Sequence, residues 1–238
     1  MTELQAVIEQ ERCRRSAHYF IFDSKLVRTT DEHDFDNPIK PFPDLLYLRI
    51  LLDWLLVSGR LIKPEDTRYA QSNTDLQWLA RLYSTRTLLM EKSRQMMLTW
   101  LVGAYVLWRA RSYPSQLLLV QSKREEDALK LVYNGNFFDS RISSMEARLP
   151  EILQRIDSVR CGHILFKGTN SHIWAIPEGG DIIRSNTASV IVADEAAYQP
   201  EFGESYTAAM PSVRGGGQYI AFSSAEPGEF QQLVEAQT

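Results

Sequence analysis

The sequence predicts an α/β fold built on a mainly parallel sheet with helices on both faces. Beyond about residue 85, short apolar runs alternate with amphipathic segments, as in strands joined by right-handed crossovers. The apolar run Ser189–Ala193 is followed by two adjacent acids, Asp194 and Glu195. Ligands bind at this end of a strand in open α/β sheets. The chain of 238 residues, 44% hydrophobic and 24% charged, has the length and composition of one large globular domain.

The first 60 residues differ in pattern from the rest. We therefore expect an N-terminal helical extension over residues 1–60 and a core over residues 61–238. The elements expected before the alternating region are a helix from about Leu4, an acidic loop over Thr30–Pro43, a helix over Asp44–Val57 that stops near Gly59, and a helix from Pro64 to about Tyr83.

The core is expected to alternate between strands and helices. The expected strands are Thr85–Met90, Gln116–Gln121, Ile156–Arg160, Ile164–Lys167, Ser171–Ile176, Asp181–Arg184, Ser189–Ala193 and Gln218–Ser223. The expected helices are Thr99–Arg111, Arg124–Phe138, Glu204–Met210 and Glu229–Glu235.

Composition excludes several classes of protein. A formal net charge of −4 argues against a general nucleic-acid coat, although a local basic patch remains possible. Two cysteines far apart in sequence, Cys13 and Cys161, predict free thiols in a reducing compartment. The apolar stretches are too short to span a bilayer, and the N-terminus has no secretory signal. We therefore expect a cytoplasmic protein without a membrane partner.

The acid pair suits one kind of chemistry, the magnesium-dependent hydrolysis of a nucleotide. In that chemistry Asp194 holds the metal through its water shell, and Glu195 orients or deprotonates the attacking water. The alternative is that Asp194 and Glu195 are only a solvated charge pair at the end of a strand, without a catalytic role. The interpretation requires a phosphate-binding loop between an earlier strand and the helix that follows it.

Glu91–Trp100, which reads EKSRQMMLTW, lies in that position. A loop that opens a helix offers N–H groups and the positive end of the helix dipole to phosphates. Thr99 could coordinate magnesium, and Lys92 and Arg94 could bring positive charge to the β- and γ-phosphates. The loop nevertheless lacks the glycines of G-x-x-x-x-G-K-[ST], and Leu98 stands at the usual lysine position. Taken alone, it reads more readily as a charged turn before an amphipathic helix.

The ordered set of motifs, from about Thr67 to Phe230, resembles the large terminase subunit, the DNA-packaging ATPase of tailed bacteriophages and related viruses. The segments that carry the resemblance are Ser93-Arg94-Gln95 with Thr99 (a variant phosphate loop), Lys92 (a displaced lysine), Val190–Ala197 (Walker B), Asp181–Ser185 (an arginine before Walker B) and Phe222–Gly228 (a third motif). Met97, where a glycine is common, and Leu98 depart from the family pattern.

The resemblance implies a P-loop NTPase fold of the RecA-like, additional-strand class, with ATP and Mg²⁺ as cofactors. The catalytic residues that it implies are Glu195 as base, Arg184 as an arginine finger supplied to a neighbouring subunit, and Arg94 near the γ-phosphate. The implied nucleotide-binding residues are Lys92, Ser93, Arg94, Gln95, Met96, Met97, Leu98, Thr99 and Ser224, with Ser223 beside the last. Thr99 and Asp194 are the implied metal ligands.

The adenine is expected against the segment before the loop, where Arg68, Tyr69 and Gln71 are candidates. A glutamine can form paired hydrogen bonds with an adenine edge. A basic surface for DNA phosphates is expected from Arg109, Arg111, Lys123 and Arg124, unless these charges are merely solvated. Each of the candidate site residues also has a structural alternative, for example as a salt-bridge partner, a helix-capping hydroxyl or a polar group at a strand end. For Arg94, Arg184, Ser223 and Ser224 the two interpretations stand level.

The expected function is that of a motor that hydrolyses ATP to translocate double-stranded DNA into a procapsid in the host cell cytoplasm. The implied partners are double-stranded DNA, the small terminase subunit, the portal protein and further copies of the chain in a ring on the procapsid. The nuclease domain of the family is expected to be absent. One alternative is a nucleotide-binding scaffold or DNA-docking module with little turnover. A helicase of the Asp-Glu-Ala type ranks last, because it requires a second RecA-like domain.

Overall fold

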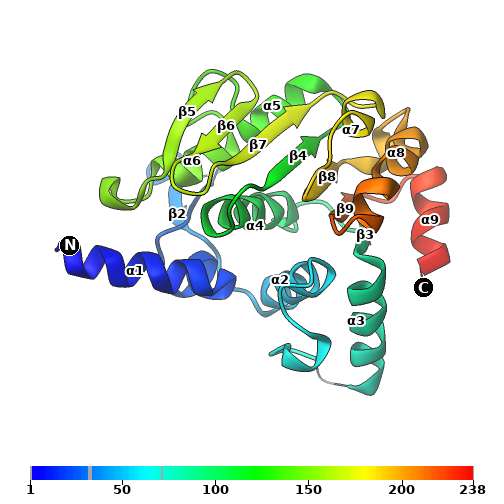
Figure 1. Cartoon of the computed structure of the whole chain (residues 1–238), viewed down its shortest axis with the longest axis horizontal. Helices are drawn as coiled ribbons and strands as arrows, with labels where there is room; N and C mark the ends of the chain where they lie inside the picture. The colour runs from blue at the N-terminus through cyan, green and yellow to red at the C-terminus, as the bar shows by residue number, and fades with distance from the viewer. Residues whose placement is uncertain (1, 32–33, 71, 238) are drawn as a thin grey trace.

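The computed structural model describes residues 2–31, 34–70 and 72–237, and it is organised around a seven-stranded sheet (Figure 1). Across the sheet the strands lie in the order β3-β9-β8-β4-β7-β6-β5. Their bounds are β3 Thr87–Glu91, β4 Leu117–Gln121, β5 Ile156–Arg160, β6 His163–Phe166, β7 Ser171–Ile176, β8 Val190–Asp194 and β9 Gln218–Ser223.

The sheet is mainly parallel, as predicted. The strands β3, β9, β8, β4 and β7 run parallel to their neighbours, and β6 and β5 extend the sheet antiparallel at one edge. Strand β9 separates β3, which precedes the candidate phosphate loop, from β8, which carries Asp194. In register, Asp194 is paired with Phe222 of β9, and Glu91 of β3 is paired with Ser223. The ends of these three strands therefore meet at one edge.

The period of two along each strand distributes apolar side chains to both faces of the sheet. In β8, Val190 and Val192 join one hydrophobic cluster while Ile191 and Ala193 join the other. The larger cluster contains residues of α1 (Glu3–Arg15), α2 (Leu46–Ser58), α3 (Asn73–Thr85), α4 (Leu98–Ser112), α5 (Glu125–Val132) and α6 (Arg141–Ala147). The smaller contains residues of α7 (Asp181–Arg184), α8 (Phe202–Arg214) and α9 (Glu229–Gln237). Helices on both faces are thus confirmed.

The N-terminal segment packs directly onto the core. Both α1 and α2 contact α4, and Figure 1 shows them on the side of α4 away from the sheet. The amide of Gln218 in β9 donates to the carbonyl of Leu55 (2.9 Å) and to the hydroxyl of Ser58 (2.7 Å) in α2. The expected boundary at residue 60 stays a prediction, but the hydrophobic core runs across it.

Several element boundaries were predicted wrongly. Asp181–Arg184 is the short helix α7 and not a strand. The expected helix Arg124–Phe138 ends at Val132, because Tyr133 adopts an extended conformation. The expected helix from Pro64 is a short 3-10 helix, Pro64–Asp66, and α3 starts only at Asn73, where Ser72 and Asp75 form a capping box.

Residues 30–43, expected to be a loop, contain most of a small antiparallel hairpin. Its strands are β1 (Arg28–Thr30) and β2 (Ile39–Pro41). Strands of three residues in an acidic, proline-containing segment carry too little alternation to be read from sequence. A π-helix, Tyr19–Asp23, and 3-10 helices over Glu151–Leu153 and Ala196–Tyr198 complete the described elements.

Candidate active site

The loop that follows β3 leads directly into α4 and is anchored to the neighbouring strand. The N–H of Lys92 donates to the carbonyl of Ser223 at the end of β9, 2.9 Å away. Gln95 and Met97 have φ values of +63° and +54°, in the left-handed region that glycine adopts most easily. The loop thus forms a tight turn without glycine, with Met97 as the residue that precedes α4. Such conformations cost about 1–3 kcal/mol each and cluster at functional sites.

The loop and the acid pair face each other, as the hypothesis of nucleotide hydrolysis requires. The hydroxyl of Thr99 donates to Oδ1 of Asp194 over 3.3 Å. The ammonium of Lys92 lies 3.7 Å from Oε1 of Glu195. These four side chains come from segments about 100 residues apart in sequence and meet at the edge where β3 and β8 end.

Asp194 is almost fully buried, with 6% of its surface exposed. Burial and the neighbouring Glu195 raise the pKa of Asp194 from 3.8 to about 6, although the positive charges of Arg141 and Lys92 and the Thr99 hydroxyl oppose the shift. The backbone of Glu195 is in the left-handed region (φ +53°) immediately after the strand. Its side chain remains 28% exposed, so water can reach it.

The third motif contributes a buried hydroxyl at the same edge. Ser223 ends β9, between the two strands that carry the loop and the acids, and is fully buried. Within the described part of the chain its Oγ has no hydrogen-bond partner. Buried polar atoms are rarely left unpaired unless a ligand or water reaches them. Ser224, the residue predicted to bind nucleotide, follows it and is half-buried.

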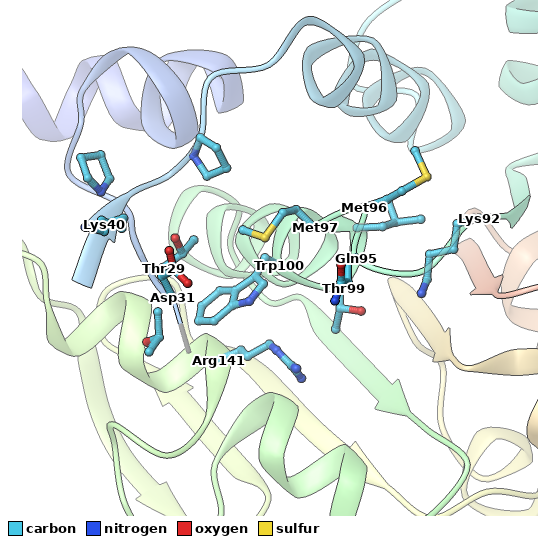
Figure 2. Close-up of a pocket in the computed structure, with 14 residues that line it drawn as sticks. Thr29, Asp31, Lys40, Lys92, Gln95, Met96, Met97, Thr99, Trp100 and Arg141 are labelled. Atoms are coloured by element: carbon cyan, nitrogen blue, oxygen red, sulfur yellow. The ribbon is translucent and has the colours of Figure 1, made fainter. Parts of the chain in front are cut away.

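A cavity of about 550 Å³ opens beside the loop and lies within the size range of small-molecule sites (Figure 2). Six of the residues predicted to bind nucleotide line it: Lys92, Gln95, Met96, Met97, Leu98 and Thr99. Its other walls are Trp100 of α4, Arg141 of α6 and residues of the β1–β2 hairpin, which are Thr29, Thr30, Asp31, Lys40, Pro41 and Pro43.

Other predicted site residues lie outside this cavity. Ser93 and Arg94 belong to the loop but are not among the lining residues, and both are exposed. Arg184 lies on α7, where its guanidinium pairs with Asp181 (3.1 Å) and Glu204 (2.9 Å).

The residues predicted to hold the adenine are not beside the loop cavity. Tyr69 lines a different cavity, between α2 and α3, and its ring lies 5.7 Å from that of His18. The backbone N–H of Arg68 donates to Asp53. Gln71 lies outside the described residues. The structure therefore gives no support to the expected adenine contacts in this segment.

The expected basic surface for DNA is partly wrong. Arg109 is buried and donates to Tyr105 and Gln116 inside the fold. Arg111 is also buried and forms an ion pair with Glu146. Only Lys123 and Arg124 of the four are exposed. A sequence shows the charge of an arginine on a helix but not which face of that helix becomes buried.

Sequence analysis missed Arg141, Trp100 and the hairpin as walls of the cavity. Arg141 belongs to no motif recognised in the sequence. It lies three residues beyond the expected helix Arg124–Phe138, which was predicted too long. The hairpin belongs to a segment that carried no strand signal. Only the position of Trp100, directly after the candidate magnesium ligand, could have drawn attention to that residue.

The donor set at the loop fits magnesium. Thr99 and Asp194 supply one hydroxyl and one carboxylate oxygen, and oxygen ligands of this kind suit Mg²⁺, which keeps several waters and is completed by substrate phosphates. Among the described residues, no three His, Cys, Asp or Glu side chains gather as an all-protein metal centre. The described helices also include none with the length and apolar character needed to cross a membrane.

No protein-family model matches the sequence, and no curated protein does. Solved structures do match the fold. The ATPase domain of the Thermus phage P74-26 large terminase aligns with a TM-score of 0.51 and 15% identity, over 69% of this chain and 74% of that one. The HK97 bacteriophage large terminase aligns with a TM-score of 0.50 and 12% identity, over 77% of this chain and 40% of that one. The chain thus covers less than half of the HK97 protein.

Proposed function

We propose that this chain, which has the P-loop ATPase fold of phage large terminase ATPase domains, binds ATP with Mg²⁺ at the Lys92–Thr99 loop and hydrolyses it. The single observation that carries the proposal is the convergence of the loop on the acid pair. Thr99 contacts Asp194, and Lys92 lies beside Glu195, across the strand ends. The cavity beside the loop, which Lys92 and Thr99 line but the two acids do not, supplies the volume for a nucleotide.

Each of these residues has a distinct part in the proposed reaction. Lys92 takes the place of the missing Walker lysine and neutralises charge on the β- and γ-phosphates. Thr99 and Asp194 hold Mg²⁺, which when bound supplies Lewis-acid charge. Glu195 orients a water and accepts its proton as the water oxygen bonds to the γ-phosphorus. The bond to the bridging oxygen breaks, and ADP and phosphate are the products.

The test measures phosphate release and ATP binding for the wild type and for Glu195→Gln. We expect Glu195→Gln to bind ATP normally but to release phosphate at least about 100-fold more slowly, because the water loses its base. Glu65→Gln removes the same charge from an exposed position and serves as the matched control. Equal rates in Glu195→Gln and the wild type would contradict the assigned role.

The alternative function is a nucleotide-binding scaffold with little or no turnover. The glycine-free loop and Leu98 at the usual lysine position favour it. ATP binding without any phosphate release, even with DNA and partner subunits present, would support this alternative over the motor.

We further propose that the energy of ATP hydrolysis drives a motor that moves double-stranded DNA into a viral procapsid. Its partners are double-stranded DNA, the small terminase subunit, the portal protein and further copies of this chain in a ring. Arg184 does not line the loop cavity of its own subunit, and its side chain is 48% exposed. Both properties suit a residue that reaches the nucleotide of a neighbouring subunit.

The ring can be tested by mixing two inactive variants, Arg184→Ala and Glu195→Gln. In a ring, an Arg184→Ala subunit keeps its own Glu195 and would receive Arg184 from a neighbouring Glu195→Gln subunit. The mixture would therefore regain phosphate release. A mixture that stays as inactive as each variant alone would oppose the transfer of an arginine between subunits.

A further inference from the structure

Arg141 lies at the loop cavity but belongs to none of the motifs. It is the first residue of α6, and it lines the cavity together with the loop residues. Its guanidinium lies over the ring of Trp100, 5.7 Å from the ring centre. Figure 2 shows the side chain extending from α6 past Trp100 in the direction of Thr99. The contact with Trp100 therefore holds the positive charge at the cavity wall.

The other cations of this cavity have carboxylate partners, whereas Arg141 has none among the described residues. Lys92 is paired with Glu195, and Lys40 is paired with Asp34. No described residue forms a hydrogen bond or ion pair with the guanidinium of Arg141. Arg141 is half-buried as a residue, and the five N–H donors of its guanidinium are free to bind water or an anion in the cavity.

Arg141 is also close to the acid that would hold the metal. Its positive charge acts on Asp194, and it lies with Thr99 along a second, smaller gap bounded by Val192. Leu98 stands where a phosphate loop usually has its lysine, so the loop itself brings only Lys92 to this wall of the cavity. A second cation that faces the same cavity would compensate for the positive charge of the missing lysine.

We propose that Arg141 is a phosphate-contacting residue, whose guanidinium donates to the β- or γ-phosphate oxygens of the nucleoside triphosphate. The planar fork of an arginine suits two phosphate oxygens at once, which a lysine cannot reproduce. The inference rests on the proposed function, because it requires the triphosphate to occupy the cavity beside the loop. It adds a residue that acts within the same subunit, unlike Arg184.

The test measures the affinity of the full chain for Mg·ATP and for inorganic tripolyphosphate by calorimetry. We expect Arg141→Gln to weaken both by at least about tenfold, because charge-assisted hydrogen bonds to phosphate are lost. Arg141→Lys should restore part of the affinity, since the charge returns without the fork. Arg160→Gln, an exposed arginine on β5, is the matched control and should bind as the wild type does.

Thermal unfolding of each variant separates a loss of contact from a loss of fold. A folded Arg141→Gln that binds both probes as tightly as the wild type would overturn the inference while leaving the proposed function intact. Wild-type protein that binds neither probe would overturn both. Equal loss in the glutamine and lysine variants, with lowered melting temperatures in both, would assign Arg141 a structural role instead.

Discussion

At the scale of single residues, Asp194 shows how the fold sets the ionisation of a candidate metal ligand. Its pKa is raised to about 6, so the folded state holds a proton that the unfolded chain releases near pH 4. In this window the folded state binds more protons, and stability therefore falls as the pH rises from about 4 to about 6. The ionised carboxylate then remains a destabilising group at neutral pH.

Asp194→Asn should therefore stabilise the metal-free protein at pH 7.5 by about 1–3 kcal/mol and flatten the slope between pH 4 and 6. The measurement is urea unfolding across that pH range. Asp157→Asn, at an exposed position on β5, is the control and should leave the slope unchanged. A lower stability of Asp194→Asn at pH 7.5 would show that burial does not dominate at this site.

The candidate site residues that the structure brings together share one property. Lys92, Thr99, Asp194 and Glu195 all follow or flank parallel strands, and the carboxyl ends of such strands meet at one edge. Arg141 comes from a helix start, where no register rule links its position to that edge. Arg109 and Arg111 were misplaced because every residue of α4 from Leu101 to Ser112 is buried, which the sequence does not reveal.

At the scale of elements, the candidate phosphate loop contains residues that are poorly suited to its backbone conformation. Gln95 is exposed and has φ +63°. Gln95→Gly should relieve this conformation and raise the free energy of unfolding by about 1 kcal/mol, despite the larger entropy of the unfolded chain. Gln95→Ala is the control and should bring no gain, because alanine keeps the Cβ atom. Thermal unfolding measures both.

A decrease in stability with Gln95→Gly would mean that the side chain of Gln95 contributes more than its backbone costs. Binding of Mg·ATP should be measured in the same variant. A more mobile turn would weaken binding even if the fold were stabilised, since the loop would have to be ordered by the ligand.

Elements made of clear apolar runs with turns on either side were predicted well. Helix α4 and strands β4, β8 and β9 lie within about one residue of the expected bounds, because long apolar patterns and flanking turns define them. Asp181–Arg184 is too short for its pattern to separate helix from strand. Helix α5 ends at Val132, where Tyr133 turns extended, and Asn134-Gly135 just beyond it is a stop signal that the expected helix Arg124–Phe138 ran through.

At the scale of the whole molecule, the N-terminal segment is part of the core and of the candidate site. Leu48, Leu52 and Leu55 of α2 are fully buried in the same cluster as α4. The β1–β2 hairpin supplies a wall of the loop cavity. The pattern of residues 1–60 predicted a separate extension, but a sequence pattern does not show which surfaces pack together.

Removal of residues 1–60 should therefore abolish cooperative folding of the remainder, because α4 would lose the helices that cover it. The measurement is thermal unfolding of residues 61–238 followed by circular dichroism. A truncated chain that unfolds cooperatively within a few degrees of the intact protein would instead support an independent core.

The proposed reaction requires one nucleotide and one metal ion in the space between the loop and the acid pair. A crystal structure with a non-hydrolysable ATP analogue and Mn²⁺ in place of Mg²⁺ tests it most directly, because manganese can be located by its anomalous scattering. We predict a manganese peak between the Thr99 hydroxyl and the Asp194 carboxylate, with the γ-phosphate facing Lys92. A nucleotide bound elsewhere, such as in the cavity lined by Tyr69, would contradict the account.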